Sequence, residues 1–254
     1  MKIAIIFAVL LSFSSMHSQL KPINYADGNQ KLIGLSAKPD KALPSKPGVL
    51  ILPAWKGIDN NSKQSAQELA ALGYHAFVAD IYGEGNYPAD SQAAGKLSGY
   101  YKSNIEKYQL RISLALEQLV KAGANPDNIA VIGYCFGGTG ALEAARAKLP
   151  VKAVVAFHGG LSKDEKRPNE KILSKVLVCH GADDPFVPET EVEAFRQEMK
   201  AREADWQLIY YADAVHSFTE EEAGTDKSKG AAYNEKADKR SWSNMLIFFN
   251  EVLK

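Results

Sequence analysis

The sequence GYCFGG, residues 133–138, joins a short apolar strand pattern at 129–133 to a helical pattern at 138–148. Glycines on both sides of Cys135 let the backbone turn sharply where larger side chains would collide with neighbouring backbone. Such a turn lifts the central side chain clear of the sheet, at the positive N-terminal end of a helix, which favours a thiolate. Cys135 is therefore a candidate nucleophile. The alternative is a glycine-rich turn around a buried, unreactive cysteine.

Strand-like and helix-like patterns alternate along the rest of the chain. After a hairpin signal at Asp27-Gly28-Asn29, we expect further strands, at 48–53, 76–79, 129–133, 151–157, 176–179 and 206–211. Helical patterns occupy 60–72, 104–122, 138–148, 188–204 and 233–253. This alternation predicts an α/β fold with a mostly parallel sheet covered by helices on both faces. Because no repeat or Pro/Ser-rich linker interrupts it, we expect residues 19–254 to form one domain.

The first eighteen residues have the layout of a secretory signal peptide. Lys2 precedes an apolar run at 3–13, and a small, polar exit follows at 14–18. The run is too short to span a bilayer comfortably, and no later stretch reaches the roughly 20 apolar residues of a transmembrane helix. We therefore expect an exported protein, periplasmic or secreted, with no membrane attachment after cleavage. A buried N-terminal strand or helix is the alternative.

The composition excludes several functions. The 30 basic and 30 acidic side chains give a net charge of zero, so no general nucleic-acid partner is expected. Two cysteines cannot build a disulfide scaffold. No glycine-rich nucleotide motif is present, so we expect no cofactor. A zinc site from His158, His180, His216 and an aspartate is conceivable, but no metal-ligand spacing supports it, so we expect no metal.

Two loops downstream of Cys135 carry an acid and a histidine. The segment GADDPFVP, at 181–188, follows one expected strand, and HSF, at 216–218, follows the next. Nucleophile, acid and histidine therefore occur in the chain order of α/β-hydrolase triads. Each group lies just past the C-terminal end of a strand, where sheets of this kind bind ligands.

These motifs resemble the dienelactone hydrolase family. The likeness runs from about residue 48 to the C-terminus, and a weaker piece, AAYNEKADKRSW at 231–242, resembles the family's last helix. The resemblance implies an α/β-hydrolase fold and a cofactor-free enzyme that hydrolyses small esters or lactones.

The resemblance also implies roles for individual residues. Cys135 would be the nucleophile, His216 the base, and Asp184 the acid that orients the histidine. The family pattern favours Asp184 over Asp183, because the acid stands immediately before the x-Phe-Val-Pro segment. Backbone N–H groups of Phe136 and Trp55 would form the oxyanion hole.

Two positions depart from the family pattern. Ala54 stands where the family has a glutamate that contacts the cysteine, so we expect His216 to contact Cys135 directly. Glu220 stands where the family has an arginine that binds the substrate carboxylate. We therefore expect neutral esters or lactones, rather than a small dianionic lactone, as substrates.

Aromatic residues flank the expected site and would form an apolar cleft. The expected substrate-binding residues are Trp55, Tyr82, Tyr134, Phe186 and Phe218. Phe136 and Phe186 could equally pack into the core. We expect no lid domain, because the connection at 159–171 is short and charged. Loops at 83–99, which includes Tyr87, and at 219–230 would cover the site instead.

Two other functions remain open at this point. The chain could be a non-catalytic binding protein that keeps the fold with an idle site. It could also be a thiol or redox protein that uses Cys135 and Cys179, although Cys179 is more typical of a small core residue at a strand end.

Overall fold

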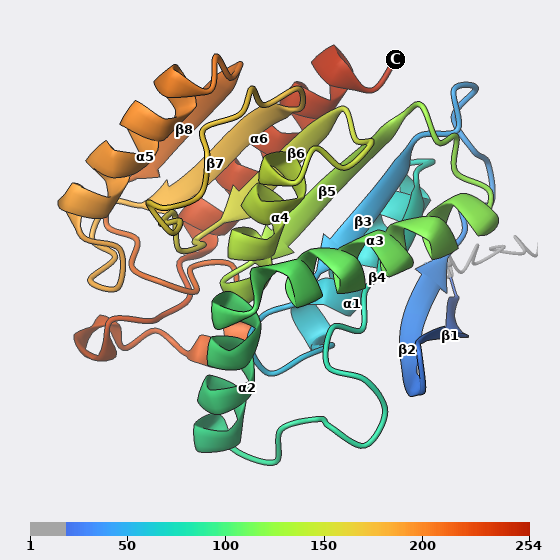
Figure 1. Cartoon of the computed structure of the whole chain (residues 1–254), viewed down its shortest axis with the longest axis horizontal. Helices are drawn as coiled ribbons and strands as arrows, with labels where there is room; N and C mark the ends of the chain where they lie inside the picture. Colours follow the sequence, from blue (N-terminus) through green and yellow to red (C-terminus); the bar gives the residue numbers. More distant parts are fainter. Residues whose placement is uncertain (1–18) are drawn as a thin grey trace, which may run out of the picture.

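The computed structural model describes residues 19–254; the expected signal peptide at 1–18 lies outside the described residues, so its cleavage and export stay predictions. The described chain forms one eight-stranded sheet in the order β1-β2-β4-β3-β5-β6-β7-β8 (Figure 1). The strands are β1 (Leu20–Asp27), β2 (Gln30–Ala37), β3 (Gly48–Leu52), β4 (His75–Val78), β5 (Ile129–Tyr134), β6 (Ala153–Phe157), β7 (Lys175–Gly181) and β8 (Trp206–Tyr211). Neighbouring strands from β4 to β8 are parallel, and β2 pairs antiparallel with both β1 and β4. The expected mostly parallel sheet is confirmed.

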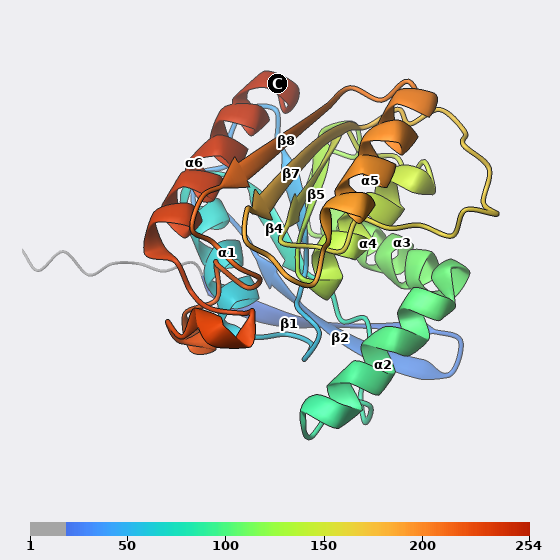
Figure 2. The ribbon, with the colours of Figure 1, turned by 90° about the vertical axis from the view of Figure 1, so that its left-hand side faces the viewer.

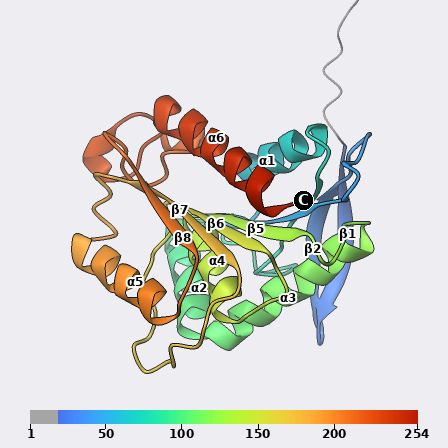
Figure 3. The same ribbon diagram turned by 90° about the horizontal axis from the view of Figure 1, so that it is seen from above.

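Helices cover both faces of the sheet (Figure 3). Helices α1 (Asn60–Ala71) and α6 (Glu235–Val252) pack on one face, and α3 (Ile105–Lys121), α4 (Phe136–Arg146) and α5 (Glu189–Ala201) pack on the other. Helix α2 (Ser91–Ser103) packs beside α3 and projects at one end of the molecule (Figure 2). Two short 3-10 turns, η1 (Glu221–Ala223) and η2 (Lys227–Lys229), follow β8.

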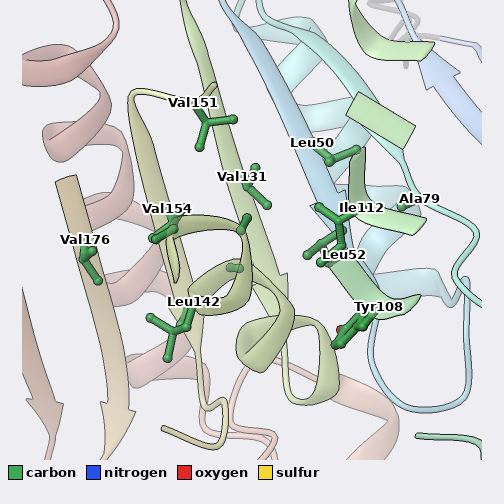
Figure 4. Packing of buried hydrophobic residues seen from close by; sticks show 14 of the residues in the cluster. Leu50, Leu52, Ala79, Tyr108, Ile112, Val131, Leu142, Val151, Val154 and Val176 are labelled. Atoms are coloured by element: carbon green, nitrogen blue, oxygen red, sulfur yellow. The ribbon is translucent and has the colours of Figure 1, made fainter. Parts of the chain in front are cut away.

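The core lies in two layers, one on each side of the sheet. Figure 4 shows part of the layer under α3 and α4, where Leu50 and Leu52 of β3 meet Tyr108 and Ile112 of α3. Every residue of β3 is buried. Burial on both faces explains why the central strands are continuous apolar runs in the sequence.

Helix α2 corrects one expectation. We expected a loop at 83–99, but Ser91–Ser103 is helical. Asp90 caps the helix by accepting a hydrogen bond from the N–H of Ala93 at 2.8 Å. Gly95 and Gly99 lie inside the helix, and glycines weaken a helical pattern in a sequence.

The connection from β6 to β7 contains no helix or strand over residues 158–174, as expected for a site without a lid domain. Arg146 anchors this connection to α4, because its buried guanidinium donates hydrogen bonds to the carbonyl oxygens of Leu161 and Ser162. The same guanidinium pairs with Glu143 and Glu198. No helix in the described part of the chain is long and apolar enough to cross a membrane.

The turn between β5 and α4 is set by close backbone contacts. Cys135 has φ 52° and ψ −113°, a conformation that side chains rarely adopt. A Cβ atom on Gly133 would overlap the carbonyl oxygen of Gly137, and one on Gly137 would overlap the carbonyl oxygen of Leu52. The glycines therefore allow three backbone segments to touch.

Replacing Gly133 tests this constraint. We expect Gly133→Ala to lower the free energy of unfolding by about 3 kcal/mol or more, because backbone must move to admit the methyl group. Gly99→Ala is the matched control, since a Cβ atom there meets no neighbour within 4 Å in the interior of α2. We expect it to stabilise by up to ~1 kcal/mol. Urea unfolding curves measure both, and equal midpoints for the two variants would contradict the argument.

Candidate active site

The structure brings Cys135, His216 and Asp184 together at one edge of the sheet. The Nε2 atom of His216 lies 3.1 Å from the Sγ atom of Cys135, and its Nδ1 atom lies 2.8 Å from the Oδ2 atom of Asp184. The three residues follow β5, β8 and β7, whose carboxyl ends meet because the strands are parallel. The expected direct contact of His216 with Cys135 is present in this geometry.

Asp184, rather than Asp183, faces the histidine. Its carboxylate is buried, and its Oδ1 atom accepts a hydrogen bond from the N–H of Phe186 at 2.9 Å. Asp183 is exposed. The second carboxylate oxygen of Asp184 is therefore held in place for His216.

His216 is placed to carry a proton. Burial lowers the pKa of its imidazole, but the hydrogen bonds with Asp184 and Cys135 outweigh burial and raise this pKa to about 10. The imidazolium form therefore persists through neutral pH. It donates one N–H to a carboxylate and the other to sulfur, which is the arrangement of an ion pair around a thiol nucleophile.

The expected oxyanion-hole residues follow β3 and β5, which are neighbouring parallel strands. Phe136 is the first residue of α4, where backbone N–H groups have no partner within the helix. Its ring stacks on Tyr108 at 4.5 Å between ring centroids, and the Tyr108 hydroxyl donates to the Phe136 carbonyl oxygen. Trp55 follows β3, and its carbonyl oxygen accepts a 2.7 Å hydrogen bond from the Tyr82 hydroxyl. The two tyrosines thus hold the carbonyl groups of the same two residues whose N–H groups are expected to form the oxyanion hole.

Three of the expected cleft aromatics, Trp55, Tyr82 and Phe186, follow the carboxyl ends of β3, β4 and β7, the edge of the sheet where Cys135 and His216 meet. Trp55 is half-buried, and Phe186 is 58% exposed with its ring edge-on to His216 at 5.4 Å. Tyr82 is buried and stacks against Phe136, so it supports Trp55 through its hydroxyl and does not line the cleft. Trp55 and Phe186 are the accessible aromatic surfaces.

Two other expected cleft residues belong to the core. Tyr134 points to the opposite side from Cys135, stacks on Phe157 and shares a 2.8 Å hydrogen bond with Ser65 of α1. Successive side chains of a strand alternate between faces, which explains this placement. Phe218 is completely buried. Their proximity in sequence to Cys135 and His216 was therefore misleading.

Glu220 is a partly buried carboxylic acid close to His216. Its Oε1 atom is buried and has no hydrogen-bond partner among the described residues. Burial and the nearby charge of Asp59 raise its pKa to about 7, against the lowering effect of His216 and Lys56. Ala54, at the other departure from the expected pattern, is buried.

The remaining candidate residues, Cys179 and His158, lie in the interior of the protein. Cys179 is buried and free, and burial raises the pKa of its thiol to about 12. His158 is fully buried beneath the site, a position that sequence patterns left open between cleft and core. Within residues 19–254, no cluster of three or more His, Cys, Asp or Glu side chains is placed to hold a metal ion.

Comparison with known proteins identifies the family of this chain. The sequence profile described as "Dienelactone hydrolase family" matches residues 32–253. A crystal structure of a dienelactone hydrolase-like promiscuous phosphotriesterase from metagenomic libraries superimposes with a TM-score of 0.86. It is 35% identical, with 94% of this chain and 100% of that chain covered.

Curated relatives extend the likeness. An uncharacterized protein of Caenorhabditis elegans is 34% identical over 58% of this chain and 94% of its own length. A probable 2-oxo-3-(5-oxofuran-2-ylidene)propanoate lactonase of Bradyrhizobium is 27% identical over 80% of this chain and 82% of its own. By its sequence profile and its fold, this chain belongs to the dienelactone hydrolase family.

Proposed function

We propose that this protein hydrolyses small, neutral carboxylic esters or lactones through a thioester formed on Cys135. The observation that carries the proposal is the position of His216, with one ring nitrogen 3.1 Å from the cysteine sulfur and the other 2.8 Å from Asp184. Family membership supports the same class of reaction, since relatives include a protein named as a probable lactonase.

The geometry supports a two-step reaction. The Cys135 thiolate attacks the substrate carbonyl carbon, and the carbonyl electron pair moves to oxygen, which the N–H groups of Phe136 and Trp55 stabilise. The intermediate collapses to a thioester as His216 gives its proton to the leaving alkoxide. Asp184 keeps the imidazole oriented throughout.

Hydrolysis of the thioester regenerates the enzyme. Neutral His216 takes a proton from water as the water oxygen attacks the thioester carbon. The second tetrahedral intermediate expels the Cys135 thiolate and releases the carboxylic acid. In a lactone the leaving hydroxyl stays attached to the acyl chain, so the product is a hydroxy acid.

Glu220 supports the choice of neutral substrates. Its carboxyl group lies close enough to His216 for the two charges to interact. Above neutral pH the negative charge of Glu220 would repel the carboxylate of an anionic substrate, but it would not repel an uncharged ester. The accessible Trp55 and Phe186 rings offer apolar contact to such an ester.

A redox function is less well supported by the same site. Cys179 is fully buried against the Tyr211 hydroxyl at 3.6 Å, and both cysteines are free. Cys135 therefore has no second reactive thiol nearby with which to form a disulfide. A non-catalytic binding role leaves the aligned Cys135–His216–Asp184 contacts unexplained.

Removing either reacting group tests the mechanism. We expect Cys135→Ala to abolish turnover of a short-chain ester, and His216→Ala to lower kcat by about 1,000-fold or more. In the wild-type protein, intact-mass analysis during turnover should detect an acyl group on Cys135. Circular dichroism checks that both variants fold. Wild-type turnover by a folded Cys135→Ala protein would contradict nucleophilic catalysis by Cys135, and an absence of turnover in the wild type would favour the binding or redox alternative.

The Glu220 carboxyl should set the preference for neutral substrates in a pH-dependent way. With a pKa near 7 the group is neutral at pH 6 and charged at pH 8.5. We therefore expect Glu220→Gln to raise kcat/KM for an anionic lactone on the order of tenfold at pH 8.5, with little change at pH 6.

Glu222→Gln serves as the matched control, because Glu222 is exposed and bonds to Asn60. The panel pairs a neutral with an anionic lactone, and adds a neutral phosphotriester because one relative is a promiscuous phosphotriesterase. Equal gains at both pH values, or in both variants, would remove Glu220 from the account of specificity.

Alkylation of Cys135 by iodoacetamide tests the ion pair. The raised pKa of His216 favours a positive charge 3.1 Å from the Cys135 sulfur, and such a charge makes a cysteine more reactive. We expect His216→Ala to lower the alkylation rate at pH 7 about tenfold or more. Equal rates in the wild type and the variant would show that His216 does not activate the sulfur.

A further inference from the structure

His158 lies directly after β6, between the nucleophile turn and the loop that carries His216. The side chain is fully buried. Its backbone has φ 39°, in the left-handed region that non-glycine residues rarely occupy. A strained, buried polar residue this close to the reacting groups calls for a role.

Its hydrogen bonds define which ring nitrogen carries the proton. The backbone N–H of Cys135 lies 3.2 Å from Nδ1 of His158, and it also donates to the carbonyl oxygen of Phe157. A backbone amide can only donate, so Nδ1 must be the acceptor and the proton must be on Nε2. The Nε2–H group then donates to the hydroxyl of Thr219 at 2.8 Å.

The ring also packs against the loop of His216. Its centroid lies 5.3 Å from that of His216 and 5.1 Å from that of Phe218, both in edge-on contacts. His158 thus contacts three of the four residues from 216 to 219. One imidazole therefore connects the backbone of the nucleophile to the segment that holds its base.

A positive charge on His158 would oppose the chemistry. Burial first, and then the nearby His216, lower the pKa of His158 well below that of an ordinary histidine, and His180 of β7 acts in the same direction. The ring is therefore neutral when His216 is charged. A proton on Nδ1 would face the Cys135 N–H group, so the neutral ring is limited to the Nε2–H form.

We propose that His158 is a positioning residue, which in its neutral Nε2–H form ties the Cys135 turn to the His216 loop and keeps their separation fixed. The inference rests on the proposed function, in which Cys135 and His216 react together. It assigns Thr219 the supporting task of accepting the hydrogen bond that selects this form.

Thr219 offers a sharp pair of variants. Thr219→Val keeps the shape of the side chain and removes the acceptor, whereas Thr219→Ser keeps the hydroxyl. We expect Thr219→Val to lower kcat about tenfold with KM within about twofold, because the His216 loop loses its tie to the nucleophile. Thr219→Ser should stay within about threefold of wild type. Equal kcat values for the two variants would overturn the proposal.

Nitrogen-15 NMR of histidine-labelled wild-type protein tests the tautomer without relying on turnover. His158→Asn identifies the signal, since asparagine tolerates positive φ. In the wild type we expect the His158 ring to stay in the neutral Nε2–H form from pH 6 to 9. In Thr219→Val we expect this form to be lost or to exchange with another tautomer. An Nδ1–H form, or a titrating ring, would overturn the proposal. The tautomer is read even if Cys135→Ala stays active, so failure of the proposed function is seen separately.

Discussion

The site depends on the approach of three backbone segments at the end of β5. A Cβ atom on Gly133 would overlap the backbone of Gly137, and one on Gly137 would overlap the backbone of Leu52. This contact bends the chain at Cys135 into positive φ and starts α4 at the next residue. The direction of the sulfur, and the N–H group of Phe136, both follow from that bend. A relaxed turn would carry the same residues without pointing them at a substrate.

His216 links the sulfur of Cys135 to the carboxyl group of Asp184. One ring nitrogen of His216 contacts the Asp184 carboxyl group, and the other contacts the Cys135 sulfur. Behind them, burial and His216 keep the pKa of His158 well below that of an ordinary histidine, so this ring adds no second positive charge beside His216. With alanine at position 54, no carboxylate competes for the cysteine, and the three groups are aligned before a substrate arrives.

Much of this arrangement is readable from the sequence because it depends on local rules. Apolar runs predict the strands, and the glycines around Cys135 predict the turn. Helix α2 was missed because Gly95 and Gly99 dilute its pattern. Tyr134 and Phe218 were misplaced because nearness in sequence to Cys135 or His216 does not decide whether a side chain lies in the cleft or in the core. His158 left one signal, a histidine at a strand end before two glycines, but its partner Thr219 is 61 residues away and only the fold joins them.

Helix α4 has a consequence for how this protein can evolve. All eleven of its residues are buried, and Cys135, the proposed nucleophile, is the residue that precedes its first turn. Substitutions along this helix disturb the packing of the sheet, so natural selection has little freedom there. Substitutions are tolerated more easily in exposed segments, such as residues 221–229 after the His216 loop. We therefore expect the helix that carries the proposed nucleophile to vary little among relatives, and the exposed loops around it to vary more.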